Sequence, residues 1–185
     1  MTQPPADLSA SGRAPARSDA GKTAVVVMGV SGSGKTTIAE ILARRLGWQM
    51  AEADDFHPAA NIAKMHDGIP LTDADREPWL IALRGWINAS PGSVILTCSA
   101  LKRSYRDVLR TADARVEFIH LDGDHDLIRR RITARKGHFM PASLLDSQFA
   151  TLEPLQPDEP GLVVGVDGDP ATIVDQAIRA LHLGG

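Results

Sequence analysis

The sequence predicts an α/β fold, in which helices cover both faces of a doubly wound, five-stranded parallel sheet and so make three layers. Two observations support this prediction. Short apolar runs alternate along the chain with segments whose apolar residues recur at helical spacing. The first apolar run, residues 24–28, leads directly into a loop with three glycines in six positions, 29–34. Because such sheets bind ligands where their strands end, we expect functional residues just after the apolar runs.

Each expected strand is a short, mostly apolar run, as in a sheet that is buried on both faces. In chain order, the expected strands are residues 24–28, 48–53, 94–98, 116–121 and 162–166. The helix expected after the first strand covers residues 36–46. It has Ile38, Leu42 and Leu46 on one face, and Gly47 is suited to end it.

Three more helices are expected further along the chain. Residues 78–89 carry two tryptophans on one helical face, and residues 124–136 are rich in arginine. The last helix is expected to start at Asp169, a suitable N-cap that precedes a proline. Residues 57–77 and 136–160 interrupt the alternation, and we interpret them as insertions over the strand ends.

The composition is typical of a globular protein of 185 residues, with 43% hydrophobic and 23% charged residues. No apolar run reaches the roughly 20 residues of a membrane-spanning helix, so we expect no membrane partner. The net charge of −3 and the 4% of aromatic residues disfavour nucleic-acid binding. The single cysteine, Cys98, fits a buried core position in a reducing, cytoplasmic protein. We expect residues 1–22 to be a disordered tail and residues 23–185 to form a single domain.

The loop after the first strand matches the phosphate-binding pattern G-x-x-x-x-G-K-[ST] and precedes the expected amphipathic helix. Its glycines let several backbone N–H groups point at one anion, and the helix start adds its positive dipole end. Lys35 can reach the β- and γ-phosphates of ATP, and the Thr36 hydroxyl can bind Mg²⁺. The sequence therefore predicts a P-loop NTPase that binds ATP and Mg²⁺ through Gly29, Val30, Ser31, Gly32, Ser33, Gly34, Lys35, Thr36 and Thr37.

An acidic turn, EADDFHP, follows the second expected strand. A carboxylate at this position would face the nucleotide from the side of the phosphate acceptor. Asp54 is our candidate for the base that takes the proton of an attacking hydroxyl, or for a carboxylate that orders Mg²⁺ through water. His57 is a site candidate by its position. The alternative is a solvated acidic turn without a function.

Basic residues follow the third and fourth expected strands. Lys102 and Arg103 lie where an anionic acceptor would bind, although the first turn of a basic surface helix would look the same. Arg135 borders a segment rich in glycine and proline. It is our candidate for an arginine that stabilises the charge on a transferring phosphoryl group. His138, in the same segment, is a further candidate by its position.

Several segments together resemble the gluconokinases, a family of small ATP-dependent sugar-acid kinases. In chain order they are GVSGSGKTT, EADDFHP, NIAKMHDGIPLTDADREPWL, CSALKRSYRDVLR and RKGHFMPASLLDSQFATLEP. The resemblance implies a core like that of nucleoside monophosphate kinases and shikimate kinase, an acceptor-binding insertion at about 57–90 and a lid at about 134–156. It also implies transfer of the ATP γ-phosphate to the 6-hydroxyl of D-gluconate, which gives 6-phosphogluconate. A homodimer and a place in carbohydrate-acid catabolism, including the pentose phosphate pathway, are implied as well.

The chemistry of gluconate, a small polyhydroxy anion, then suggests roles for the remaining candidates. Asp55 and His57 would orient hydroxyl groups of the acceptor, with His138 beside them. The acceptor's negative charge would be neutralised by Lys102, Arg103 and Arg76. Lys35, Mg²⁺ and Arg135 would carry the charge of the transferring phosphoryl group.

Two alternative functions are compatible with the same motifs. A related kinase for shikimate or another sugar acid would use the same phosphate loop and insertions. A nucleotide-binding switch without catalysis would retain the fold, although it would not need the acidic turn and the lid arginines. Release of ADP that depends on the acceptor distinguishes a kinase from such a switch.

Overall fold

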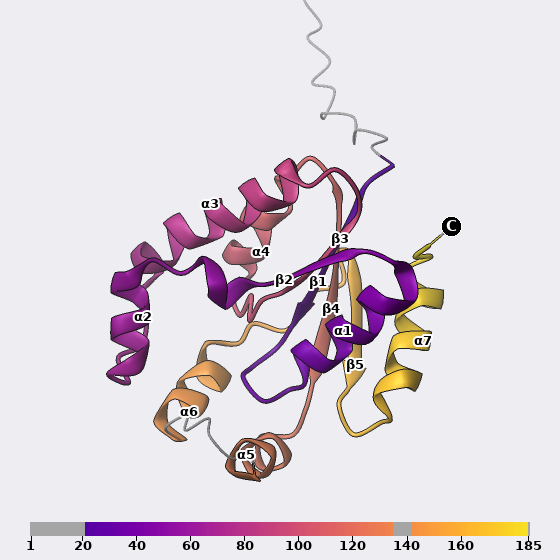
Figure 1. The fold of residues 1–185 in the computed structure, drawn as a ribbon. Helices are drawn as coiled ribbons and strands as arrows, with labels where there is room; N and C mark the ends of the chain where they lie inside the picture. Colours follow the sequence, from indigo (N-terminus) through magenta and orange to yellow (C-terminus); the bar gives the residue numbers. More distant parts are fainter. Residues whose placement is uncertain (1–20, 135–141, 185) are drawn as a thin grey trace, which may run out of the picture.

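The computed structural model describes residues 21–134 and 142–184 (Figure 1). Its centre is a five-stranded sheet in the order β2-β3-β1-β4-β5, and every neighbouring pair of strands is parallel. The predicted fold class and strand number are confirmed. Because β1 lies in the middle, the loop that follows it opens at the centre of the sheet's carboxyl edge. The strands are β1 (Thr23–Met28), β2 (Gln49–Glu52), β3 (Val94–Thr97), β4 (Arg115–Asp122) and β5 (Gly161–Gly165).

Helices cover both faces of the sheet, which gives the three predicted layers (Figure 1). Val25 and Val27 of β1 belong to the hydrophobic cluster under α1 (Lys35–Leu46) and α7 (Pro170–Ala180). Val26 and Met28 face the opposite cluster, under α3 (Asp73–Ala89) and α4 (Arg103–Leu109). Successive residues of a strand point to opposite faces, so β1 has to be apolar throughout. This requirement explains the uninterrupted apolar run from which the fold was predicted.

A third hydrophobic cluster lies beyond the carboxyl edge of the sheet. Val30 of the glycine-rich loop packs there with Leu101, with Ile128 of α5 (His125–Ala134) and with Leu145 of α6 (Ala142–Thr151). The side chains of all four residues are buried. Two helices that follow β4 are therefore held directly against the loop that follows β1.

Helix α3 is longer than the sequence predicted, because it begins at Asp73 and not at Pro78. A capping box sets its start: the Thr72 hydroxyl accepts from the Asp75 N–H at 3.2 Å, and the Asp75 carboxylate accepts from the Thr72 N–H at 2.9 Å. Two N–H groups without helical partners are thereby satisfied. Pro78 removes one hydrogen bond inside the helix, and the helix tolerates this loss.

The predicted C-terminus of α1 and the predicted N-terminus of α7 are confirmed. Gly47 ends α1 in a left-handed conformation with φ of 66°. Asp169 caps α7, since its carboxylate accepts from the Thr172 N–H at 3.1 Å. The predicted tail falls mostly on residues 1–20, which lie outside the described residues. Lys22, the last residue of the predicted tail, donates from its ammonium to the carbonyl of Ser90 at 2.6 Å.

The insertion after β2 contains a 3₁₀ turn, η1 (Ala53–Phe56), and a short helix, α2 (Ala59–His66). Figure 1 shows α2 at the outer end of α3, away from the sheet. In the second insertion the structure describes α6 and the segment that leads from it to β5. Neither α2 nor α6 was predicted as a helix from the sequence. Within the described ranges, 21–134 and 142–184, every helix is too short or too polar to cross a membrane.

A buried ion pair ties the segment after α6 to the loop after β3. The Arg106 guanidinium binds both oxygens of the Glu159 carboxylate, at 2.6 and 2.8 Å, and both side chains are fully buried. Arg106 also donates to the carbonyls of Ala100, at 3.1 Å, and Glu153, at 3.0 Å. A guanidinium in this fork geometry satisfies its donors while it fastens three stretches of backbone together.

Candidate active site

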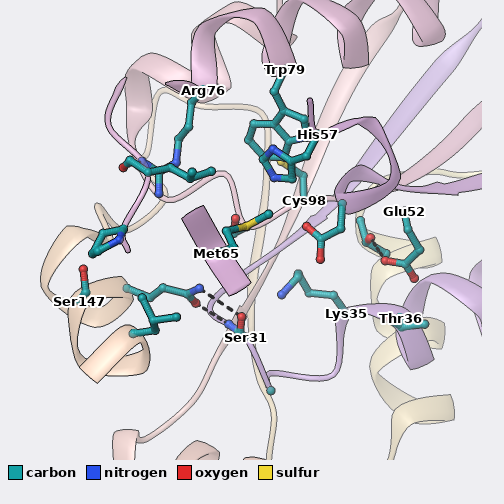
Figure 2. Close-up of a pocket in the computed structure, with 18 of the residues that line it drawn as sticks. Ser31, Lys35, Thr36, Glu52, His57, Met65, Arg76, Trp79, Cys98 and Ser147 are labelled. Atoms are coloured by element: carbon teal, nitrogen blue, oxygen red, sulfur yellow. Dashed lines mark hydrogen bonds between the residues drawn. The ribbon is translucent and has the colours of Figure 1, made fainter. Parts of the chain in front are cut away.

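A cavity of about 480 Å³ opens at the carboxyl ends of β1, β2 and β3 (Figure 2). Its walls come from the glycine-rich loop, from the acidic turn after β2, from the start of α3 and from α6. Its polar, charged and aromatic lining includes Ser31, Lys35, Thr36, Glu52, Asp54, His57, Arg76, Trp79, Cys98 and Gln148.

Two glycines let the glycine-rich loop pack closely against α5 and leave the start of α1 open to a ligand. Gly32 has a φ of 80°, which is a left-handed conformation. A Cβ atom at this position would lie 2.5 Å from Cγ1 of Ile132 on α5. Gly34 has no side chain to cap α1, so no cap from this residue occupies the first N–H groups of the helix, and these groups are available to bind an anion. Lys35 follows immediately, and its ammonium donates to the carbonyl of Val30 at 3.1 Å.

Glu52, the last residue of β2, was not among the predicted site residues. One of its carboxylate oxygens accepts a hydrogen bond from the Thr97 hydroxyl. The other oxygen is buried and has no partner among the described residues. Figure 2 shows the Glu52 carboxylate pointing toward Thr36 of the phosphate loop. A buried carboxylate oxygen without a partner is costly unless a ligand or water satisfies it.

The two aspartates of the acidic turn lie in different environments. Asp54 lines the cavity, whereas Asp55 is exposed and does not line it. Both belong to η1, and successive residues of a tight turn point in different directions. The structure thus brings Asp54 into one cavity with Lys35 and Thr36, and it leaves Asp55 outside.

His57 is held as a neutral ring against the cavity wall. It stacks on Trp79 with a centroid distance of 4.3 Å, and the Trp79 indole donates to the Ala53 carbonyl at 2.7 Å. Burial lowers the pKa of His57 below 6.5; nearby Asp54 raises it in part and Arg76 lowers it further. The Asn61 amide lies 3.4 Å from Nδ1, which suits a ring with its hydrogen on Nε2.

The predicted basic residues separate into two groups. Arg76 lines the cavity, and its guanidinium lies 5.5 Å from the centre of the Tyr105 ring. Lys102 pairs with Asp73 at 2.8 Å and Arg103 with Asp158 at 2.6 Å, and neither basic residue lines the cavity. Arg135 and His138 lie outside the described residues.

Cys98 also borders the cavity, at the end of β3. Its side chain is buried, as predicted, and burial raises the pKa of the thiol to about 12. The thiol is therefore protonated at neutral pH and is unsuited to act as a nucleophile.

A second cavity of about 370 Å³ lies on the other side of the phosphate loop. Ser33, Thr37 and the loop before α7 line it, together with Arg131 of α5. The Arg131 guanidinium donates to the carbonyl of Val166, another lining residue, at 2.7 Å. The phosphate loop thus separates two cavities, with Ser31 on the side of the acidic turn and Thr37 on the other side.

Comparison with known proteins places this arrangement in a family. A family model described as an AAA domain matches residues 25–155. The gluconokinase of Gluconobacter oxydans is 52% identical over 159 residues, which cover 84% of this chain and 89% of that protein. The chain belongs to the gluconokinase family.

Solved structures of similar proteins agree with this membership of the gluconokinase family. A gluconokinase from Sinorhizobium meliloti is 44% identical, with a TM-score of 0.80 over 88% of this chain and 93% of that one. A sugar kinase from Janibacter is 54% identical, with a TM-score of 0.84 over 88% of this chain and 95% of that one. Shikimate kinase from Bacteroides thetaiotaomicron, at 18% identity and a TM-score of 0.63 over 87% of this chain and 99% of that one, shares the fold. The predicted likeness to shikimate kinase is therefore confirmed at the level of the fold.

Three residues that line the two cavities, Glu52, Arg131 and Gln148, were missed by sequence reasoning. Glu52 stands in the same acidic run as Asp54, so its position after β2 could have revealed it. Arg131 belongs to the arginine-rich helix, and its spacing alone does not distinguish it from its neighbours. Gln148 gave no signal, because nothing in the sequence shows that α6 reaches the phosphate loop.

Proposed function

We propose that this protein is a gluconokinase, which transfers the γ-phosphate of ATP to the 6-hydroxyl of D-gluconate. One observation carries the proposal: Lys35 and Thr36 of the P-loop motif line the same cavity as Asp54, His57 and Arg76. A phosphoryl group and a small hydroxy acid would meet there with a carboxylate beside them. Membership of the gluconokinase family supports gluconate as the acceptor.

The second cavity is suited to the nucleoside of ATP. It lies beside the start of α1 and is lined by Ser33, Thr37 and Arg131. ATP would then extend from this cavity along the loop, with its γ-phosphate toward Asp54. A planar guanidinium such as that of Arg131 can stack on a purine base. We therefore propose the second cavity as the adenosine site.

The residues around Thr36 fit a Mg²⁺ ion. The Thr36 hydroxyl and the unpartnered oxygen of Glu52 are hard oxygen donors of the kind this ion prefers, and Asp54 lines the same cavity. Mg²⁺ keeps several waters, so a small set of protein ligands is sufficient. When bound, Mg²⁺ supplies electrostatic stabilisation of the phosphoryl oxygens during transfer.

The acceptor side supplies the base and the binding groups. We assign Asp54 as the base that accepts the proton of the 6-hydroxyl as its oxygen attacks phosphorus. The Nε2–H of neutral His57 would donate to an acceptor hydroxyl, and Arg76 would bind the carboxylate. Asp55, Lys102 and Arg103 stay predicted acceptor residues although they do not line the cavity. Arg135 and His138 stay predictions as well.

We also propose a homodimer that works in the cytoplasm, in carbohydrate-acid catabolism and the pentose phosphate pathway. The family resemblance supports these assignments. Sedimentation equilibrium tests the dimer directly, because a homodimer would have twice the mass of the 19.8 kDa chain.

A coupled ADP-release assay tests the proposed function. Mg²⁺-ATP is supplied with gluconate, other aldonates, shikimate or no acceptor. We expect turnover with gluconate and none in the blank. Turnover with shikimate alone, or hydrolysis that needs no acceptor, would contradict the proposal.

A substitution pair tests the assignment of the base. Asp54→Asn should lower kcat by roughly 10²–10⁴-fold, the usual contribution of a general base. Asp113→Asn makes the same chemical change at an exposed site and should leave kcat unchanged.

A further inference from the structure

Helix α6 reaches the phosphate loop through one side chain, Gln148. Its carbonyl oxygen accepts a hydrogen bond from the backbone N–H of Ser31 at 2.7 Å. Its amide nitrogen donates to the Ser31 hydroxyl at 3.1 Å. Figure 2 draws both hydrogen bonds to Ser31 as dashed lines. Two bonds to a single residue fix the orientation of that residue's backbone as well as its position.

The helix that carries Gln148 is itself held in place. Leu145, one turn earlier, is buried with Val30 of the phosphate loop and Ile128 of α5. Phe149, the next residue after Gln148, packs against the same cluster. Because this cluster contains Val30, the residue before Ser31, α6 contacts the loop through apolar packing as well as through the hydrogen bonds of Gln148.

The position of Ser31 shows which end of the phosphate loop is held. Ser31 lines the cavity that also contains Asp54 and His57. Ser33 and Thr37 line the second cavity, on the opposite side of the loop. Ser31 therefore lies at the end of the loop nearest the acceptor, where the γ-phosphate would be transferred.

We propose that Gln148 is a positioning residue for phosphoryl transfer, which acts through Ser31 to fix the transfer end of the phosphate loop. This inference rests on the proposed function, and it adds a residue from outside the loop to the nucleotide site. Leu144 and Ser147 of the same helix line the acceptor cavity. Helix α6 thus sets the position of the loop relative to the wall that the acceptor contacts. A displacement of about 1 Å in such a contact can reduce turnover by roughly 10²-fold.

The first test removes the contact. Gln148→Ala loses both hydrogen bonds, so kcat with gluconate should fall by about 10- to 100-fold. Binding of ADP should stay within about threefold of the wild type, because ADP lacks the phosphate at this end of the loop. Gln176→Ala makes the same change at an exposed site on α7 and should leave both quantities unchanged.

The second test keeps the contact and changes its charge. In Gln148→Glu one oxygen can still accept from the Ser31 N–H, and the other can accept from the Ser31 hydroxyl. The added negative charge would lie beside the γ-phosphate. Titration calorimetry should therefore show that a non-hydrolysable ATP analogue loses at least about tenfold more affinity than ADP does.

The inference requires both results, together with a melting temperature close to that of the wild type. It is overturned if Gln148→Ala keeps kcat within about twofold, or if it loses ADP binding and thermal stability to the same degree. If the wild type phosphorylates no sugar acid, the proposed function fails on its own. The affinity ratio of the Gln148→Glu variant then still decides the inference, since an unchanged ratio would contradict it.

Discussion

The two walls of the large cavity are built in different ways. The proposed nucleotide wall is one continuous stretch, residues 29–37, and the groups expected to bind phosphate there are mainly backbone N–H groups. The proposed acceptor wall is assembled from side chains of β2, η1, α2, α3 and α6. Charged residues near the acceptor wall are largely engaged with one another, as in the pairs Lys64–Asp75 and Lys102–Asp73, both at 2.8 Å.

This difference determines what each wall tolerates. A backbone site depends on chain geometry, so it is disrupted by an added Cβ atom more than by a change of charge. A side-chain site depends on which charges face the cavity and which are neutralised by a neighbour. Arg76 faces the cavity, whereas Lys102 and Arg103 have carboxylate partners outside it.

In the nucleotide wall, the largest effect should follow from Gly32→Ala. The new Cβ would lie 2.5 Å from Ile132, at a residue with φ of 80°. We expect kcat/KM for ATP to fall by about 100-fold or more, because the loop can no longer hold its geometry. Gly85→Ala is the matched control: no described atom lies within 4 Å of its Cβ, and it should retain activity. Normal kinetics in Gly32→Ala would show that the loop is not rigidly packed.

Arg76→Met should show that the acceptor wall depends on charge. The variant keeps most of the unbranched apolar stem of the side chain and removes the cation, so the KM for gluconate should rise by roughly 10- to 100-fold. The KM for ATP should be unchanged. Arg84→Met, two turns further along α3, removes an arginine bonded to Thr111 at 3.1 Å and should leave both KM values unaltered. Equal increases in both KM values for Arg76→Met would contradict a role specific to the acceptor.

The pH dependence of the acceptor wall should reflect His57. Its pKa is held below 6.5, so the ring is neutral at pH 7 and gains a proton only as the pH falls below that value. The protonated ring would face Arg76 and lose the acceptor nitrogen opposite Asn61. We expect kcat/KM for gluconate to be level from pH 7 to 8 and to fall below pH 6.5, by up to about tenfold per unit. In His57→Gln this acidic decline should disappear, and its persistence would assign it to another group.

The lowered pKa of His57 makes the folded protein less stable in acid than at neutral pH. The unfolded chain takes up the proton near pH 6.5, and the folded chain takes it up only at a lower pH. Stability is therefore lost as the pH falls from 6.5 toward the folded pKa. A melting curve measured against pH would show this as a lower melting temperature in acid, reduced in His57→Gln.

The smallest effect should come from Arg103→Gln. Its pair with Asp158 is exposed, and exposed pairs contribute about 0–1 kcal/mol to stability. Since Arg103 does not line the cavity, we expect kcat and the KM for gluconate to stay within about twofold of the wild type. A tenfold rise in this KM would instead support the acceptor role predicted from the sequence, and would place Arg103 with Arg76 in the acceptor wall.

The contrast between the walls also explains which residues could be predicted. The spacing of Gly29, Gly34 and Lys35 encodes a backbone shape, and one stretch of sequence contains all of it. The fold could also be predicted, because the apolar periodicity of each strand or helix is likewise contained in one stretch of sequence. Asp73 and Asp158 lie 29 and 55 positions from the basic residues they bind, so the sequence did not reveal that Lys102 and Arg103 were paired.

Two further residues show where local patterns fail. Pro78 looked like a helix start, because the capping box at Thr72 lies in a stretch without apolar periodicity. Gln148 lies 117 positions after Ser31 in the sequence, and the packing of α6 on Val30 brings the two residues together. Both were determined by interactions that a periodicity search does not detect.

The buried pair of Arg106 and Glu159 has a consequence for how the molecule opens. Removing one member would leave an uncompensated charge in the interior, at a cost of about 3–5 kcal/mol. The loop after β3 and the segment after α6 should therefore unfold together, as one cooperative unit. Amide hydrogen exchange would detect this, because the N–H of Glu153, bonded to the Leu101 carbonyl at 2.7 Å, should exchange as slowly as the neighbouring sheet. Any opening motion of α6 would then have its boundary before residue 153, and the remainder of the chain to β5 would move with the sheet.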